Sequence, residues 1–381
     1  MIARGIIRLL KYVQDHSDFR KPKAENVRHI LLVETTRFGD LIAAMSSYQR
    51  FATTFPNATI TILLHEDHVS VMPALGVNVR CITLPWPRDL YGCIEALLDL
   101  HERRFDLACS MSPSAKNSFL ALFAPADLHT GYLEGDASLT PHRSALALDS
   151  SPPVLERIIV PVNTNIYDRS GAVADQLGCV ISDAMIVPLP EYVTKEWPTL
   201  VSRLKVDPRR PIVVIHPFAG WKFREWHLQH VRAFVEILRD ACPDVQVVVL
   251  GKEKDFIAGV RAVLRFLKGV HVLGSDDWLV SALLISHCTV FIGTDSGPLH
   301  LAAALGVRVL GLYGPAAPAA TAPPERGGRR RTLYYRLNCS PCDQRTCVAP
   351  NAPCMTGITP SAVFEAVAPF ILKTKVPVAN A

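Results

Sequence analysis

The chain contains 381 residues, of which 49% are hydrophobic and 20% are charged. These proportions exclude a disordered chain, and the length is sufficient for two or three domains. Forty Lys and Arg against 35 Asp and Glu leave a net charge of +5, which argues against a dedicated nucleic-acid-binding protein. No apolar run reaches the ~18 residues of a membrane-spanning helix and no secretory signal pattern follows Met1, so we expect a cytoplasmic protein.

Residues 1–27 are predicted to form a basic amphipathic extension. Apolar residues recur at helical spacing in its first half, and Arg4, Arg8 and Lys11 lie on the opposite face. Such a helix can bind an anionic membrane surface, here the inner face of the membrane. The alternative is that it docks on its own domain or on a partner protein.

From residue 28 the sequence alternates between short apolar runs and amphipathic segments. The pattern predicts, in chain order, a strand at 30–33, a helix at 41–55, strands at 59–64 and 107–110, a helix at 115–123, a loop over 130–153 and a helix within 156–178. Strand, helix and strand at this spacing form a βαβ unit, which implies a parallel sheet with right-handed crossovers.

The same alternation restarts at residue 211. It predicts strands at 212–215, 245–250, 289–292 and 307–313, and helices at 229–240, 278–286, 299–305 and 361–372. Two such series joined near residues 190–210 indicate an α/β protein with two Rossmann-like domains. Ligands of open α/β sheets bind outside the carboxyl ends of the strands, so the loops at these ends should carry the function.

The first such loop is Arg37-Phe38-Gly39-Asp40. Gly39 permits a tight turn between the strand and the helix, and Asp40 falls near the helix start. A carboxylate at this place is a candidate catalytic group. The alternative is that Asp40 is only the N-cap of the helix, which is a common role for aspartate.

The second loop, residues 216–226, contains Pro217 and Gly220 and presents Lys222 and Arg224 before a helix. Cations at a strand exit can clamp a diphosphate, for which arginine offers a planar fork and lysine a compact charge. The alternative is a solvated basic loop without a ligand.

The third loop follows the strand predicted at 289–292 and leads into the short helix predicted at 299–305. Its small residues Gly293, Ser296 and Gly297 let backbone N–H groups at a helix N-terminus approach an anion. His300 is placed to donate to a phosphate oxygen, and Asp295 to hold a hydroxyl or orient the loop. Neither a Walker loop nor the GxGxxG dinucleotide fingerprint is present.

These loops occur together in a recognisable order. The Asp40 loop, the 216–226 segment, the block 294–306 and Leu312-Tyr-Gly-Pro315 follow one another at the spacing of glycosyltransferase family 9, the ADP-heptose:lipopolysaccharide heptosyltransferases, which the chain resembles over residues 28–370. The resemblance implies a GT-B fold, in which two Rossmann-like domains face a central cleft.

The resemblance also implies a role for each domain. Residues 28–190 would take the acceptor, residues 191–360 the sugar nucleotide, and a C-terminal helix in 361–381 would return to the first domain. By family pattern Asp40 is the catalytic base. The implied substrate-binding residues are Arg224 with Lys222 nearby for the diphosphate, Asp295, Ser296, Gly297 and His300 for the donor, Glu253 for its ribose, and Lys116 for acceptor or donor phosphate.

The implied reaction is inverting transfer of heptose from ADP-heptose onto a hydroxyl of a lipopolysaccharide core, a related surface glycan or a protein. No cofactor is needed for catalysis in this scheme, because the cations and the helix N-terminus stabilise the leaving diphosphate. Three alternatives stay open. A GT-B epimerase would convert the donor without an acceptor, an inert sugar-nucleotide-binding protein would not need Asp40, and a nicotinamide-dependent oxidoreductase would share only the fold class.

Four of the ten cysteines crowd into residues 339–354. Cys339, Cys342, Cys347 and Cys354 have the spacing C-x₂-C-x₄-C-x₆-C. In a reduced compartment such a cluster is more often a metal site than a disulfide framework. The spacing therefore predicts a structural zinc or iron held by four thiolates. The alternative is a loop of unrelated thiols or a single disulfide formed during purification.

Overall fold

The computed structural model describes residues 23–75, 79–86, 88–135, 156–161, 164–180, 189–252, 259–260, 262–264, 267–325, 327–342, 344, 346–349 and 351–372. The chain divides into two compact units, Met1–Ala184 and Met185–Ala381. The division falls before residue 190, where the first domain was expected to end. Most of the predicted N-terminal extension, Glu253 and residues 373–381 lie outside the described residues.

The first unit is built on one parallel sheet. Its elements are η1 (Ala24–Asn26), β1 (His29–Glu34), α2 (Phe38–Ala43), α3 (Met45–Thr54), β2 (Thr59–His65), η2 (Glu66–Leu75), β3 (Val79–Leu84), α4 (Leu90–Glu102), β4 (Phe105–Ser110), α5 (Ala115–Phe123), β5 (Ala126–Gly135), β6 (Glu156–Pro161) and α6 (Ile166–Gln176). The strand order is β3-β2-β1-β4-β5-β6, and all neighbours pair in parallel. The predicted βαβ architecture is confirmed for this unit.

The centre of this sheet follows the apolar run that the sequence shows. Ile30, Leu31, Leu32 and Val33 of β1 are fully buried, as expected for a central strand covered on both faces. Along the chain, strands are added on one side of β1 up to β3, and then on its other side from β4 to β6. The order therefore reverses between β1 and β4.

One sequence prediction for this unit is wrong in part, because the segment expected to be a loop from residue 130 begins inside strand β5. The helix expected within 156–178 is confirmed as α6, although strand β6 precedes it in the same range. β6 is an edge strand that pairs only with β5. The helix predicted at 41–55 is also interrupted, at Ala44, into α2 and α3.

The second unit repeats the plan. Its elements are α7 (Glu191–Thr194), α8 (Trp197–Leu204), β7 (Ile212–His216), η3 (Lys222–Arg224), α9 (Leu228–Ala241), β8 (Gln246–Gly251), β9 (Val270–Gly274), α11 (Trp278–Ser286), β10 (Val290–Thr294), α12 (Gly297–Ala304), β11 (Val309–Tyr313), α13 (Pro318–Thr321), β12 (Arg330–Tyr334), α14 (Pro353–Thr356) and α15 (Pro360–Leu372). The strand order is β12-β11-β10-β7-β8-β9, again with parallel neighbours. This order reverses between β7 and β10.

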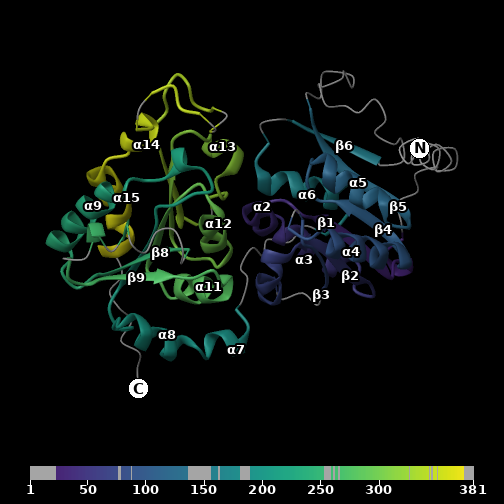
Figure 1. Cartoon of the computed structure of the whole chain (residues 1–381), viewed down its shortest axis with the longest axis horizontal. Coiled ribbons are helices and arrows are strands. Elements are labelled where there is room, and N and C mark those ends of the chain that lie inside the picture. Colours follow the sequence, from purple (N-terminus) through teal and green to yellow (C-terminus); the bar gives the residue numbers. More distant parts are fainter. Residues whose placement is uncertain are drawn as a thin grey trace. The chain divides into compact units, whose positions relative to one another are not determined.

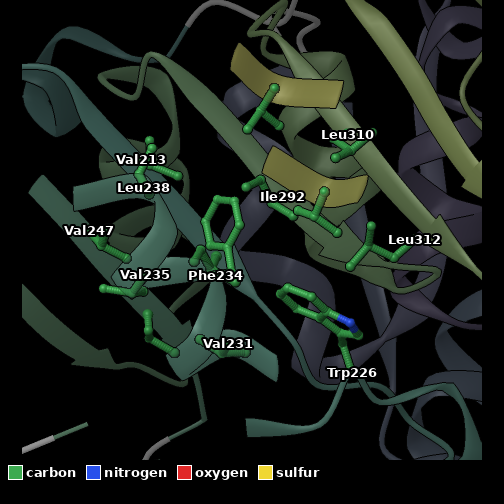
Figure 2. Packing of buried hydrophobic residues seen from close by; sticks show 14 of the residues in the cluster. Val213, Trp226, Val231, Phe234, Val235, Leu238, Val247, Ile292, Leu310 and Leu312 are labelled. Carbon is green, nitrogen blue, oxygen red and sulfur yellow. The ribbon is translucent and has the colours of Figure 1, made fainter. Parts of the chain in front are cut away.

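The core of the second unit lies between its sheet and helix α9. Figure 2 shows Phe234 of α9 and Trp226 among side chains of the sheet such as Ile292 and Leu312, all of them buried. The Trp226 indole Nε1 donates to the carbonyl of Ile358 at 3.0 Å, which satisfies its polar atom inside an apolar cluster. This bond also ties the loop after β7 to the segment that precedes α15.

Helix α15 corrects one expectation about the C-terminus. It packs on α9 of the second unit, beside which it lies in Figure 1. The buried residues of the helix that join the second core are Val363, Val367, Phe370 and Ile371. The prediction that this helix returns to the first domain is wrong for its described part. None of the described helices combines the length and the apolar character needed to cross a bilayer.

The packing of α15 gives a prediction with an internal control. Ile371 is 5% exposed and its neighbour Leu372 is 65% exposed. Ile371→Ala should lower the free energy of unfolding of the second unit by about 2–5 kcal/mol, because it leaves a cavity in the core. Leu372→Ala should change it by less than about 0.5 kcal/mol. Urea unfolding of both variants is the measurement, and equal losses would contradict the assignment of α15 to this core.

Candidate functional site

In the first unit, a cavity of about 310 Å³ lies where the strand order reverses. Among its lining residues, Glu34 comes from the end of β1, Ser112 follows β4, and Arg169 belongs to α6, while Asp40 and Arg37 come from the loop and helix after β1. The reversal point of a parallel sheet is the usual ligand site of α/β folds, since the chain leaves a crevice there. The structure therefore places Asp40 on a cavity that is large enough for part of a small ligand.

Asp40 is the third residue of α2 and is half-buried. The N-cap of this helix is Arg37, whose side chain makes no capping hydrogen bond. The alternative that Asp40 is merely the N-cap is therefore wrong. Asp40 lines the cavity, which suits a group that exchanges a proton with a ligand.

Glu34 is a second carboxyl group in the same cavity, and the sequence analysis missed it. It is 1% exposed, and its Oε1 accepts hydrogen bonds from the backbone N–H of Thr36 at 3.2 Å and from the hydroxyl of Thr36. Burial, and then the charge of Asp40, raise the pKa of Glu34 to about 8. At neutral pH, Glu34 is thus predominantly a neutral acid beside Asp40.

A buried amide fixes the loop between these two carboxyl groups. Asn117 of α5 accepts from the backbone N–H of Thr35 at 3.3 Å and donates to the carbonyl of Val33 and the hydroxyl of Ser112. Lys116 Nζ donates to the carbonyl of Thr35 at 3.2 Å. Burial lowers the pKa of Lys116, against the opposing effect of the Glu34 charge. Lys116 thus supports the loop, but it is not among the described residues that line the cavity.

In the second unit, the ends of β7 and β10 meet at the other reversal point. His216 ends β7, and its Nδ1 lies 3.3 Å from the hydroxyl of Ser296, the N-cap of α12. Burial lowers the pKa of His216 to about 4, so the ring is neutral at physiological pH. Thr294 completes the junction by donating to the carbonyl of Phe218 at 2.6 Å. Ser296 and Gly297 therefore open α12 directly beside the exit of β7.

An ion pair joins the second and third predicted loops. Arg224 Nη1 lies 2.9 Å from Asp295 Oδ2 and donates to the Asp295 carbonyl at 3.1 Å. On its other side, Asp295 Oδ1 is 3.9 Å from Nε2 of His300, which is 3% exposed in α12. The structure thus brings Arg224, Asp295 and His300 together. In this arrangement the Asp295 carboxylate lies between the two nitrogen-bearing side chains.

The two predicted cations do not share this position. The guanidinium of Arg224 stacks 4.8 Å from the ring centroid of Trp221, whereas Lys222 is exposed. Gln344 also contacts Arg224, since its Oε1 accepts from Arg224 Nε. Gln344 and His216 were not among the predicted site residues. His216 could have been found as the terminal residue of a central strand, but Gln344 gives no signal in the sequence.

The four cysteines of the loop 339–354 range from exposed Cys339 to buried Cys354. Burial raises the pKa of the Cys354 thiol, and the charges of Cys347, Cys342 and Cys339 raise it further. The four sulfurs thus share one neighbourhood. Within the residues that the structure describes, however, no group of three or more His, Cys, Asp or Glu side chains has the arrangement of a formed metal site.

The raised pKa of Glu34 predicts a specific pH dependence of stability. Its ordinary value is 4.5, so between about 4.5 and 8 the unfolded chain loses this proton and the folded chain keeps it. Stability should fall with rising pH across that window and level off above it. Glu34→Gln should remove this fall and be more stable than the original chain at pH 8 by on the order of 2–4 kcal/mol.

Urea unfolding at pH 5, 6.5 and 8 measures this difference. Glu102→Gln, at the exposed end of α4, is the matched control and should give no difference that grows with pH. A stability gain of Glu34→Gln that is the same at all three pH values would contradict the buried neutral acid.

Comparisons with known proteins identify the family of the chain. The family model for glycosyltransferase family 9 (heptosyltransferase) matches residues 97–352. The chain is 24% identical over 311 residues to lipopolysaccharide heptosyltransferase 2 of Salmonella typhimurium, covering 77% of this chain and 85% of that protein.

Solved structures show the same fold at low sequence identity. The ADP-heptose lipopolysaccharide heptosyltransferase II of Escherichia coli aligns with a TM-score of 0.68 at 20% identity, over 91% of this chain and 100% of that one. The iron-containing dodecameric glycosyltransferase TibC of enterotoxigenic E. coli aligns with a TM-score of 0.55 at 14% identity, over 92% and 78%. The fold is therefore of the GT-B type, and the chain belongs to glycosyltransferase family 9, the heptosyltransferase family.

Proposed function

We propose that this glycosyltransferase transfers heptose from ADP-heptose to a hydroxyl group of a lipopolysaccharide core. The observation that carries the proposal is the placement of Asp40 at one sheet's reversal point and of Arg224 with His300 at the other's. Relatives named as lipopolysaccharide heptosyltransferases support the substrate class. A related surface glycan or a protein side chain is the alternative acceptor.

On the acceptor side, the reaction requires a group that takes a proton as the hydroxyl oxygen attacks the anomeric carbon. Asp40 has the chemistry and the cavity for this role, and general-base help is typically worth ~10²- to 10⁴-fold. The neighbouring Glu34 keeps its own proton at neutral pH, so it does not compete for the one that Asp40 accepts. In an inverting displacement the nucleoside diphosphate leaves from the opposite face of the sugar.

On the donor side, the departing diphosphate gains negative charge. Arg224 engages its neighbours through Nε and Nη1, and within the described part of the chain Nη2 takes no partner. This leaves a guanidinium edge for a phosphate oxygen. The N–H groups at the start of α12 and His300 add to the stabilisation of the leaving group.

The acceptor class also suggests where the protein works. Lipopolysaccharide core assembly on a lipid would place the enzyme in the cytoplasm, at the inner face of the membrane. The basic residues Arg4, Arg8 and Lys11 support peripheral contact with an anionic surface, although they lie outside the described residues.

The catalytic role of Asp40 is tested by Asp40→Asn. This change keeps the size of the side chain and removes the proton acceptor, so turnover should fall at least ~10²-fold while ADP binding stays unchanged. Product formation from ADP-heptose with a lipid-linked core acceptor is the measurement, with binding followed by calorimetry. Near-normal turnover would remove Asp40 from the mechanism, and lost ADP affinity with turnover kept would make it a binding residue.

The donor role of the second unit is tested by comparing its two cations. Arg224→Ala should weaken ADP binding by roughly 1–3 kcal/mol, because it removes a charge-assisted hydrogen bond. Lys222→Ala is the matched control from the same turn, and it should cost less because Lys222 is exposed and outside the ion pair. A larger loss with Lys222→Ala would identify the lysine as the diphosphate ligand.

The chemistry of the loop 339–354 supports a structural metal. We propose that its four cysteines hold zinc, with iron as the alternative, because four thiolates suit both ions. The shared neighbourhood of the sulfurs and the exposure of Cys339 allow them to close around an ion, which would order the loop. The solved neighbour TibC is described as iron-containing, which supports iron as the second candidate.

Elemental analysis of protein purified without chelator tests this proposal. About one equivalent of zinc or iron is expected, and Cys342→Ser should abolish it. Cys288→Ser, which changes a cysteine outside the loop, should retain the metal. Less than about a tenth of an equivalent together with four free loop thiols would exclude the site.

A further inference from the structure

A side chain of the loop 339–354 contacts Arg224, which forms the donor cluster with Asp295 and His300. Gln344 Oε1 accepts a hydrogen bond from Arg224 Nε, across 120 positions of the sequence. Gln344 lies between Cys342 and Cys347, so it belongs to the middle of the four-cysteine loop. The loop therefore touches the residue that the proposed function assigns to the diphosphate.

The contact bears on where Arg224 points. The guanidinium is held at Nη1 by Asp295 and on one face by the ring of Trp221. Neither contact uses Nε, and a partner on that edge further restricts rotation of the planar guanidinium in its plane. Gln344 supplies this partner. The direction in which Nη2 faces an incoming phosphate is consequently set from the loop.

The loop itself is anchored on the sheet. The backbone N–H of Cys342 donates to the carbonyl of Pro315, just after β11, at 3.1 Å. A Cβ added to Gly314 would lie 2.9 Å from the Cys354 carbonyl oxygen, so the two backbones meet with no room for a side chain. Gln344 has φ of 62°, a left-handed conformation that residues other than glycine seldom adopt. Such a conformation persists where its surroundings hold it.

We propose that Gln344 is a positioning residue of the donor site, which holds Arg224 in the orientation that binds the nucleoside diphosphate. This inference rests on the proposed donor role of Arg224. It gives the four-cysteine loop a part in donor binding in addition to any structural metal. Gln344 acts only through Arg224, and this property makes the proposal testable by a double-mutant cycle.

The experiment measures ADP affinity by calorimetry for the full chain and for the variants Gln344→Ala, Arg224→Ala and their combination. Gln344→Ala alone should weaken ADP binding about tenfold, the effect of losing one hydrogen bond to a charged group. In the Arg224→Ala background the same change should matter by less than about twofold, since its target is gone. Val348→Ala is the matched control, because Val348 is 88% exposed in the same loop.

Thermal unfolding and a rescue variant separate positioning from folding. Gln344→Ala, Gln344→Glu and Val348→Ala should unfold at the temperature of the original chain, and Gln344→Glu, which keeps an oxygen acceptor for Nε, should bind ADP more tightly than Gln344→Ala. Unchanged affinity in Gln344→Ala, or an equal loss with and without Arg224, would overturn the inference while leaving the donor role of Arg224 intact. If Arg224→Ala itself binds ADP normally, the proposed function fails at this residue.

Discussion

In each sheet, the first strand along the chain is central. The following strands are added toward one edge of the sheet, and the later strands toward the other edge. The strands on either side of the reversal, β1 with β4 and β7 with β10, therefore send their following segments away from each other. The crevice left between them is where backbone groups and side chains at strand ends can face a ligand. Asp40 and Glu34 in one unit, and His216 and Asp295 in the other, owe their positions to this constraint.

The two crevices handle buried polar groups in different ways. Burying a charge is costly unless the group is neutralised or paired. Glu34 is neutralised, because burial and Asp40 together keep its proton in place. His216 is also neutral, because burial lowers its pKa, whereas burial raises the pKa of Glu34. Arg224 and Asp295 stay charged as a pair, which leaves a directed cation where an anionic ligand is expected.

Much of the fold follows from local pattern. The apolar runs that become β1, β7 and β10 are buried on both faces, and the helices predicted at 115–123 and 278–286 have the bounds of α5 and α11. The edge strand β6 was missed although Ile158, Ile159 and Val160 form a short apolar run, because so short a run does not by itself distinguish a strand from a helix segment. The assignment of α15 to the first domain came from resemblance, whereas its apolar face fits α9.

The sequence predicted those site residues whose reactive or charged side chains lie in a segment that follows a strand. These are Asp40, Arg224, Asp295 and His300. Glu34 and His216 both end a central strand, and this position could have marked them as candidates, but only their burial shows that their proton affinity is altered. Gln344 could not be found from the sequence. Its significance comes from a contact across 120 positions, which no local pattern encodes.

The place of α15 in the second core has a consequence for biosynthesis. The first unit has its described elements by residue 176, so it can fold while the rest of the chain is still being made. The second unit needs Val367 and Ile371 to cover α9, and its last strand, β12, ends at Tyr334, before these residues are made. During that interval an apolar surface is exposed. Nascent chains of this protein should therefore depend most on chaperones late in translation.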